Sequence, residues 1–145
     1  MARGYPDFFG YSVFPTWGPA NMQDHLVDTV NPFNIETVYE LTQKGTIYGG
    51  WLRMYDSLAG GGSFIRCTID GVLLSRRTPE QMLLYTLTYD ESMPFFVTLH
   101  DIPGQNWIIQ FSRGVNFGYQ YKLELEHVGL GAIDIEGKLF YAYVQ

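Results

Sequence analysis

The longest alternating stretch of this chain is VNFGYQYKLELEHV, at residues 115–128. Apolar and polar side chains follow one another there with a period of two, which is the period of a β-strand. One dry face and one wet face is typical of an antiparallel sheet with one side packed on a core. We therefore expect Phe117, Tyr119, Leu123 and Leu125 to be buried.

The strongest turn signal is Asp70-Gly71 in the segment SFIRCTIDGVLLS. Both residue types tolerate the positive φ angles of a tight hairpin turn. Before the turn, Ile65, Cys67 and Ile69 alternate with polar residues. The segment predicts a β-hairpin whose first strand places these three side chains in the core.

Further short runs have strand character and lie between turn-forming residues. They cover residues 35–42, 45–56, 94–101, 106–111 and 132–144, and the last reads as a second hairpin that turns at Glu136-Gly137. Gly49 and Gly50 interrupt the second run and predict a bulge or a close approach of another backbone. About eight strands at intervals of about ten residues indicate an all-β antiparallel β-sandwich, which we expect to be jelly-roll-like.

One helix start stands out, at TPEQMLL. Thr78 can cap the helix, Pro79 suits its first position, and Gln81 completes a capping box. A strand over the residues that follow is a competing interpretation. We expect one short helix within the sandwich.

The first 34 residues differ from the rest of the chain because prolines and glycines interrupt an aromatic run. We interpret residues 1–34 as an ordered, extended N-terminal arm and residues 35–145 as the β-sandwich domain. An arm so rich in aromatic side chains needs a surface to cover them. That surface belongs either to a neighbouring subunit or larger particle, which we favour, or to the arm's own sandwich. The predicted interface residues are Tyr5, Phe8, Phe9, Tyr11, Phe14 and Trp17.

Composition narrows the classes of function. The 145 residues suit one domain, and a single cysteine forms no intrachain disulfide. The net charge of −6 argues against nucleic acid and anionic membranes as partners. We see no signal peptide and no apolar run long enough to span a membrane.

No motif for catalysis or for metal binding emerges, so we expect no enzyme, no cofactor and no metal. His100-Asp101 lies at the end of a predicted strand. A zinc or catalytic site is one interpretation of this pair, but we favour the simpler one, a polar pair at the point where the chain leaves the sheet. His127 continues the dry face of the longest run and reads as a hydrogen-bonded, half-buried histidine. Cys67 lies between two isoleucines and reads as a core residue, not a nucleophile.

Aromatic residues make up 17% of the chain, and several predicted strands carry large side chains on both faces. Such strands are central or face a partner. We therefore favour a core and a subunit interface. A sugar platform that uses Trp51 or Trp107 is the alternative.

The aromatic arm ARGYPDFFGYSVFPTWG, the strand GTIYGGW and the hairpin strand that ends in IDG resemble those of small all-β accessory proteins of tailed-bacteriophage virions. Head-decoration, head-fibre and receptor-binding jelly rolls belong to this group. The resemblance implies a non-enzymatic structural or attachment protein of the virion, made in the host cytoplasm. It also implies a homo-oligomer, usually a trimer, docked on a capsid through its arm. A carbohydrate- or receptor-binding module is the first alternative, and a small β-barrel enzyme or ligand carrier is the second.

Overall fold

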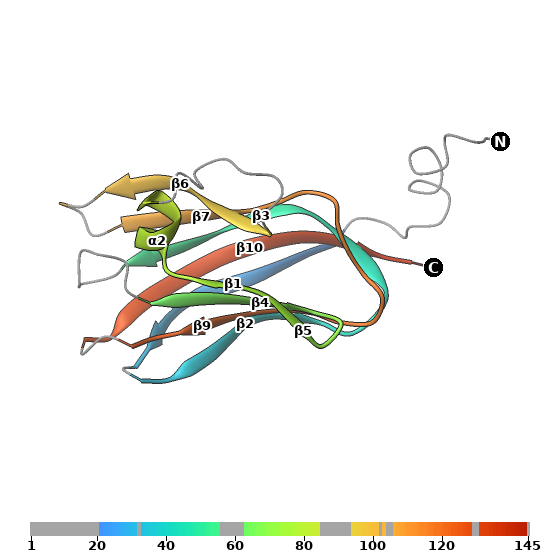
Figure 1. Cartoon of the computed structure of the whole chain (residues 1–145), viewed down its shortest axis with the longest axis horizontal. Coiled ribbons are helices and arrows are strands. Elements are labelled where there is room, and N and C mark those ends of the chain that lie inside the picture. The colour runs from blue at the N-terminus through green and yellow to red at the C-terminus, as the bar shows by residue number, and fades with distance from the viewer. Residues whose placement is uncertain are drawn as a thin grey trace.

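The computed structural model of the chain describes residues 21–31, 33–55, 63–84, 94–101, 103, 106–128 and 131–144. Within these ranges the chain forms two antiparallel sheets that lie one over the other (Figure 1). The prediction of an all-β antiparallel sandwich is confirmed. The jelly-roll subtype stays a prediction, and the aromatic residues of the predicted arm lie outside the described residues.

The larger sheet has the strand order β1-β10-β3-β7-β6, and β8 pairs with one end of β3. All of its strand pairs are antiparallel. Its strands are β1 (Asn21–Val30), β10 (Ile133–Tyr143), β3 (Gly45–Tyr55), β7 (Asn106–Phe111), β6 (Phe95–Asp101) and β8 (Val115–Phe117).

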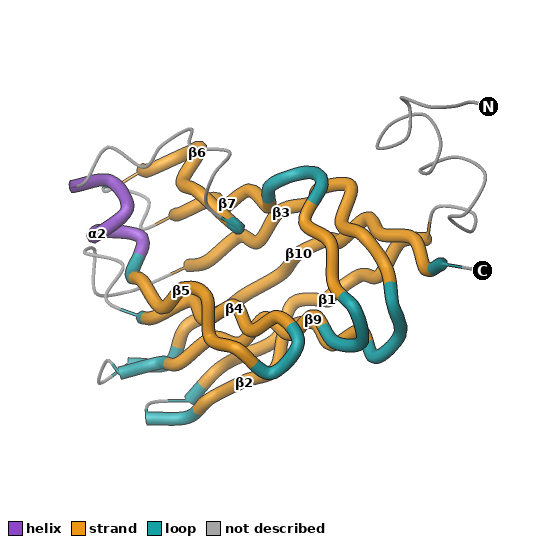
Figure 2. Tube along the Cα trace, turned by 45° about the vertical axis from the view of Figure 1, so that its right-hand side comes forward, coloured by secondary structure: helices purple, strands orange, loops and turns teal. Residues whose placement is uncertain are grey.

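The smaller sheet has the order β2-β9-β4-β5, again antiparallel throughout. Its strands are β2 (Ile35–Leu41), β9 (Tyr121–Glu126), β4 (Phe64–Ile69) and β5 (Val72–Arg77). A short helix, α2 (Pro79–Leu84), follows β5 and contacts β6 of the other sheet at one end of the sandwich (Figure 2).

The core lies between the sheets and is built by alternation. On β9, Leu123 and Leu125 are fully buried, and on β4 so are Ile65 and Cys67, as the sequence predicts. The larger sheet contributes the buried inner face of its own strands, with Leu52, Met54, Trp107, Ile109, Ile135 and Leu139. Ile69 is only partly buried and packs at the edge of this cluster.

The prediction for Tyr119 is wrong, since its side chain is 60% exposed. The alternating run is interrupted because the Asp70 carboxylate accepts backbone hydrogen bonds from Gly118, Tyr119 and Gln120, at 2.7, 2.7 and 3.0 Å. The Tyr119 hydroxyl donates to the Asp70 carbonyl. These bonds bend the chain between β8 and β9 and turn Tyr119 outward.

The two local turn and cap predictions hold. Asp70 and Gly71 adopt φ angles of +51° and +81° at the β4–β5 hairpin turn. At the start of α2, the Gln81 backbone N–H donates to the Thr78 hydroxyl, and the Thr78 backbone N–H donates to the Gln81 side-chain oxygen. This reciprocal pair is the capping box that the sequence predicts.

A close backbone approach does occur at Gly50, where an added Cβ would meet the Lys138 carbonyl and lie 2.9 Å from the Phe111 ring. The pairing register between β3 and β10 also shifts beside Gly49. Because the shift changes the parity of the strand, Ile47 and Leu52 both reach the core.

The expected turn at Glu136-Gly137 is wrong, because β10 runs through these residues without a break. Gly137 is needed for space instead. An added Cβ would lie 2.6 Å from the Trp51 carbonyl oxygen and 2.7 Å from the Tyr39 hydroxyl.

The sandwich begins earlier than the sequence suggests. Residues 21–30, which the sequence analysis places in the arm, form the edge strand β1, with Asn21 opposite Tyr141 and Val30 opposite Ile133 of β10. The sequence analysis missed this strand because prolines lie on both sides of it. A proline favours extended backbone in the residue before it, and this does not distinguish a strand from an extended arm.

The hydrogen bonds from three backbone N–H groups to the Asp70 carboxylate, here called the Asp70 clamp, make a pH-dependent contribution to the stability of the fold. The N–H groups of Tyr119, Gly118 and Gln120 hold the pKa of Asp70 below its ordinary value of 3.8. A carboxylate with a lowered folded-state pKa stabilises above the unfolded-state value, and this contribution is lost as the pH falls through the folded-state pKa. Denaturant unfolding should therefore show Asp70→Asn to be less stable than the wild type at neutral pH, with the gap closing below pH 3.8.

Tyr119→Phe is the matched control, because it keeps the three N–H donors and removes only the hydroxyl. It should retain the acid-side loss of stability. A gap for Asp70→Asn that is constant down to the most acidic pH would contradict the clamp.

Candidate functional site

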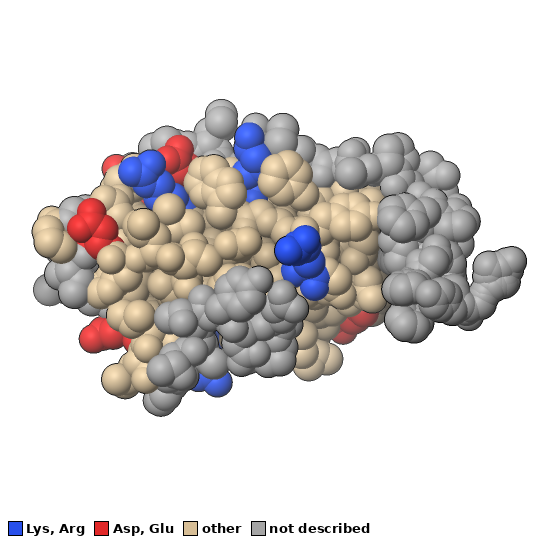
Figure 3. Space-filling view, turned by 90° about the horizontal axis from the view of Figure 1, so that it is seen from above, with Lys and Arg blue, Asp and Glu red and all other residues tan. Residues whose placement is uncertain are grey.

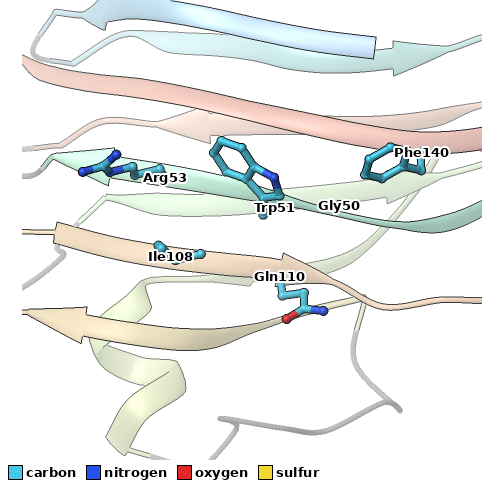
Figure 4. A pocket seen from close by; sticks show the side chains of 6 residues that line it. All are labelled: Gly50, Trp51, Arg53, Ile108, Gln110 and Phe140. Atoms are coloured by element: carbon cyan, nitrogen blue, oxygen red, sulfur yellow. The ribbon is translucent and has the colours of Figure 1, made fainter. Parts of the chain in front are cut away.

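Charged residues make up 17% of the chain. On the face seen from above in Figure 3, a few Lys, Arg, Asp and Glu side chains lie scattered among uncharged atoms. The outer face of the larger sheet carries an open, mostly apolar groove of about 520 Å³. Strands β3, β7 and β10 line it, as Figure 4 shows, with Gly50, Trp51, Arg53, Ile108, Gln110 and Phe140.

The pairing register explains why these side chains meet. On β3, Trp51 is opposite Gln110 and Arg53 is opposite Ile108 of β7. Their strand neighbours Leu52 and Ile109 point into the core, so these four side chains point outward. Phe140 extends the same face on β10 and is 39% exposed.

Gly50 forms the floor of the groove. Its φ of +141° belongs to a region that side-chain-bearing residues rarely adopt. Gly50 lines the groove between Trp51 and Phe140 (Figure 4).

Polar groups stand at one side of the apolar centre. Arg53 lies 3.4 Å from a Glu136 carboxylate oxygen and 4.3 Å from the centre of the Tyr55 ring. These two contacts hold the guanidinium at the rim. Gln110 is exposed, so its amide can donate and accept. The groove thus combines aromatic faces with a few hydrogen-bonding groups, as ligand and peptide sites do.

A second apolar surface lies on the smaller sheet. Strand β5 is at the edge of that sheet, and its first three side chains, Val72, Leu73 and Leu74, are all exposed. Leu83 and Leu84 of α2 are exposed as well. Contiguous exposed apolar residues mark interaction surfaces.

The sugar-platform prediction divides between the two tryptophans. Trp51 lines the groove, whereas Trp107 is 1% exposed and presents no free face to a sugar. Alternation places Trp107 on the inner side of β7, where His100 stacks on it with 3.9 Å between ring centres. The six predicted arm aromatics lie outside the described residues.

Two sets of reactive side chains, the Ser63–His127 pair and the Cys67 thiol, are buried inside the sandwich. Ser63 and His127 are fully buried, with the hydroxyl 2.6 Å from Nδ1. His127 Nε2 hydrogen-bonds to the Gly131 carbonyl, which only accepts, so Ser63 donates to Nδ1. Burial raises the pKa of the Cys67 thiol to about 12. Neither group reaches a substrate from these positions.

Metal and membrane features are not apparent in the part of the chain that the structure describes. No group of three or more His, Cys, Asp or Glu side chains is placed to hold a metal ion there. In the same residues, no helix has the length and hydropathy to cross a membrane.

Arg53, Ile108, Gln110 and Phe140 are the groove residues that sequence reasoning missed. Each lies at an outward position that only the pairing of β3 with β7 and β10 reveals. The signal that was available was the presence of large side chains on both faces of these strands.

The chain matches no protein-family model and no curated protein.

The close approach of β10 and Phe111 to Gly50 is tested by Gly50→Ala. The positive φ costs about 1–3 kcal/mol for a residue with a Cβ. The clash with Phe111 and the Lys138 carbonyl adds about 1–3 kcal/mol. Unfolding in denaturant should show a loss near the sum of the two.

Gly114→Ala is the matched control. Gly114 also has a positive φ, +78°, but an added Cβ meets nothing within 4 Å. It should lose only about 1–2 kcal/mol. Equal losses at the two positions would show that Gly50 is not a point of close approach.

Proposed function

We propose that this chain is a non-enzymatic structural or attachment protein that associates with copies of itself and with a larger protein assembly. A virus particle is the assembly that its sequence resemblance suggests, with capsid decoration as the role. The observation that carries the proposal is the aromatic groove over Gly50, lined by Trp51, Ile108 and Phe140 on an outer sheet face.

We also assign the sandwich to the jelly-roll type. Without β6 and β8, the remaining strands can be numbered one to eight in chain order. The two sheets then read 1-8-3-6 and 2-7-4-5. In this order the first strand pairs with the last, the second with the seventh, the third with the sixth, and the fourth with the fifth. A rolled-up hairpin produces such pairs, and viral capsid proteins and lectins use it.

Exposed apolar surface supports self-association. The groove and the edge strand β5 lie on different sheets, so a single partner surface does not cover both. A head-to-tail contact between two different surfaces closes into a ring when the rotation allows it. A trimer is the state we propose.

Carbohydrate or receptor binding is the second candidate. It is favoured by Trp51, whose partly exposed side chain lines the groove together with Arg53 and the exposed Gln110. An aromatic face with nearby hydrogen-bonding groups suits a sugar ring. Glycan-array binding that Trp51→Ala abolishes would favour this candidate over assembly.

Sedimentation of the full chain and of a chain lacking residues 2–19 tests the assembly role. The full chain should sediment as an oligomer at micromolar concentration, and the shortened chain as a folded monomer. Circular dichroism reports the folding of each. A length-matched chain with the six arm aromatics replaced by serine should behave like the shortened one.

Three results would count against the proposal. A sharp monomer peak for the full chain would refute self-association. An unchanged oligomer after the deletion would remove the arm from the contact. Unfolding of both arm variants would make the arm part of the core.

A further inference from the structure

We propose that the groove over Gly50 of one copy binds the N-terminal arm, residues 1–20, of a neighbouring copy. This inference rests on the proposed function and names the partner of the groove. Its occupant is an extended, aromatic segment of a second identical chain.

The arm begins beside the groove. Strand β1 starts at Asn21, which pairs with Tyr141, and Met22 pairs with Phe140 of β10. Phe140 is itself one wall of the groove. The twenty residues before β1 therefore enter the sandwich next to the site that has apolar side chains to cover.

Direction and reach favour a neighbour's arm over the chain's own. Strand β1 begins at the end of the sheet where β10 ends, since Asn21 lies opposite Tyr141. An arm that continued the direction of β1 would lead away from the sheet, and Pro19 favours extended backbone at Gly18. To lie on its own groove, the arm would have to reverse.

The distance to the groove centre makes the same point. Tyr141 pairs with both Asn21 and Ile47, and Trp51 lies four positions further along β3. Trp51 is thus roughly 16 Å from Asn21, given the usual strand rise and spacing. The four residues from Trp17 to Asn21 span at most about 14 Å. The backbone of the chain's own Trp17 therefore falls short of the position above its own Trp51.

The chemistry of the two surfaces is complementary. Trp51, Ile108 and Phe140 offer an apolar bed for aromatic side chains. Prolines deprive the arm of backbone donors, so its carbonyls need donors from outside. Gln110 and Arg53 stand at the groove and supply N–H groups to such carbonyls.

Arm-in-groove contacts are head-to-tail, since the two surfaces differ. Each copy gives an arm to one neighbour and receives one from another. Repetition around an axis produces a closed ring and leaves the outer side of β5 free for the larger assembly.

Photocrosslinking of the full chain tests the inference. Cys67 is buried and its thiol has a pKa of about 12, so an engineered surface cysteine is the reactive thiol. Gln110→Cys, labelled with a benzophenone maleimide, should give covalent oligomers on irradiation. Protease digestion and mass spectrometry should locate the crosslink in the arm. Thr37→Cys, exposed on the opposite sheet, is the control and should not capture the arm.

Mixing 15N-labelled and unlabelled chains identifies the donor of the arm. Mixed-isotope crosslinks show a neighbour's arm. The double variant Phe14→Ala with Trp17→Ala should lower their yield about tenfold, as the loss of an aromatic anchor does. Val128→Ala, which changes an exposed apolar residue outside the groove and outside the surface of β5 and α2, should leave the yield unchanged.

The outcomes separate this inference from the proposed function. Crosslinks confined to single chains would mean that each arm covers its own groove, which overturns the inference. An oligomer without arm crosslinks at residue 110 would also overturn it while leaving self-association intact. A chain that stays monomeric in sedimentation would overturn both.

Discussion

The close approach of the two sheets at Gly137 is the constraint on which the rest of the sandwich depends. Tyr39 reaches from β2 across the core, and its hydroxyl occupies the space that a Cβ at Gly137 would fill. Its ring also packs edge-to-face on Phe111 of β7, with 5.9 Å between centres. One tyrosine thus joins the smaller sheet to two strands of the larger one. Because β10 carries no side chain at that point, it passes under Tyr39 without a break.

The packing of the core determines which side chains the outer face of the larger sheet carries. Leu52 and Met54 occupy the inner face of β3, and alternation then places Trp51, Arg53 and Tyr55 on the outer face. Gly50 makes a tight contact with the backbone of β10 and also lines the groove beside Trp51. The aromatic surplus of the chain is therefore not all core. Part of it forms a groove, and an assembly role gives that groove a use.

Local signals were readable from the sequence because the groups that interact are neighbours in the chain. Asp70-Gly71 and the Thr78–Gln81 box belong to this kind. Long-range effects were not readable. Tyr119 is exposed because a carboxylate 49 positions away binds its amide, and Gly137 serves a tyrosine of the other sheet. The groove likewise needs the register of three strands. Its only trace in the sequence is a set of large side chains on both faces of β3.

Trp51 emission as a function of protein concentration tests the assembly role most directly. In a Trp17→Phe chain, the remaining tryptophans are Trp51 in the groove and Trp107, which is 1% exposed and so already shielded from water within a single chain. If a neighbour's arm covers the groove, the Trp51 emission should shift to the blue as copies associate. The protein concentration at the midpoint of this shift should equal the concentration at which sedimentation shows half of the chains associated. The shift should vanish when residues 2–19 are removed. Association that leaves the emission of Trp51 unchanged would contradict the role assigned to the groove.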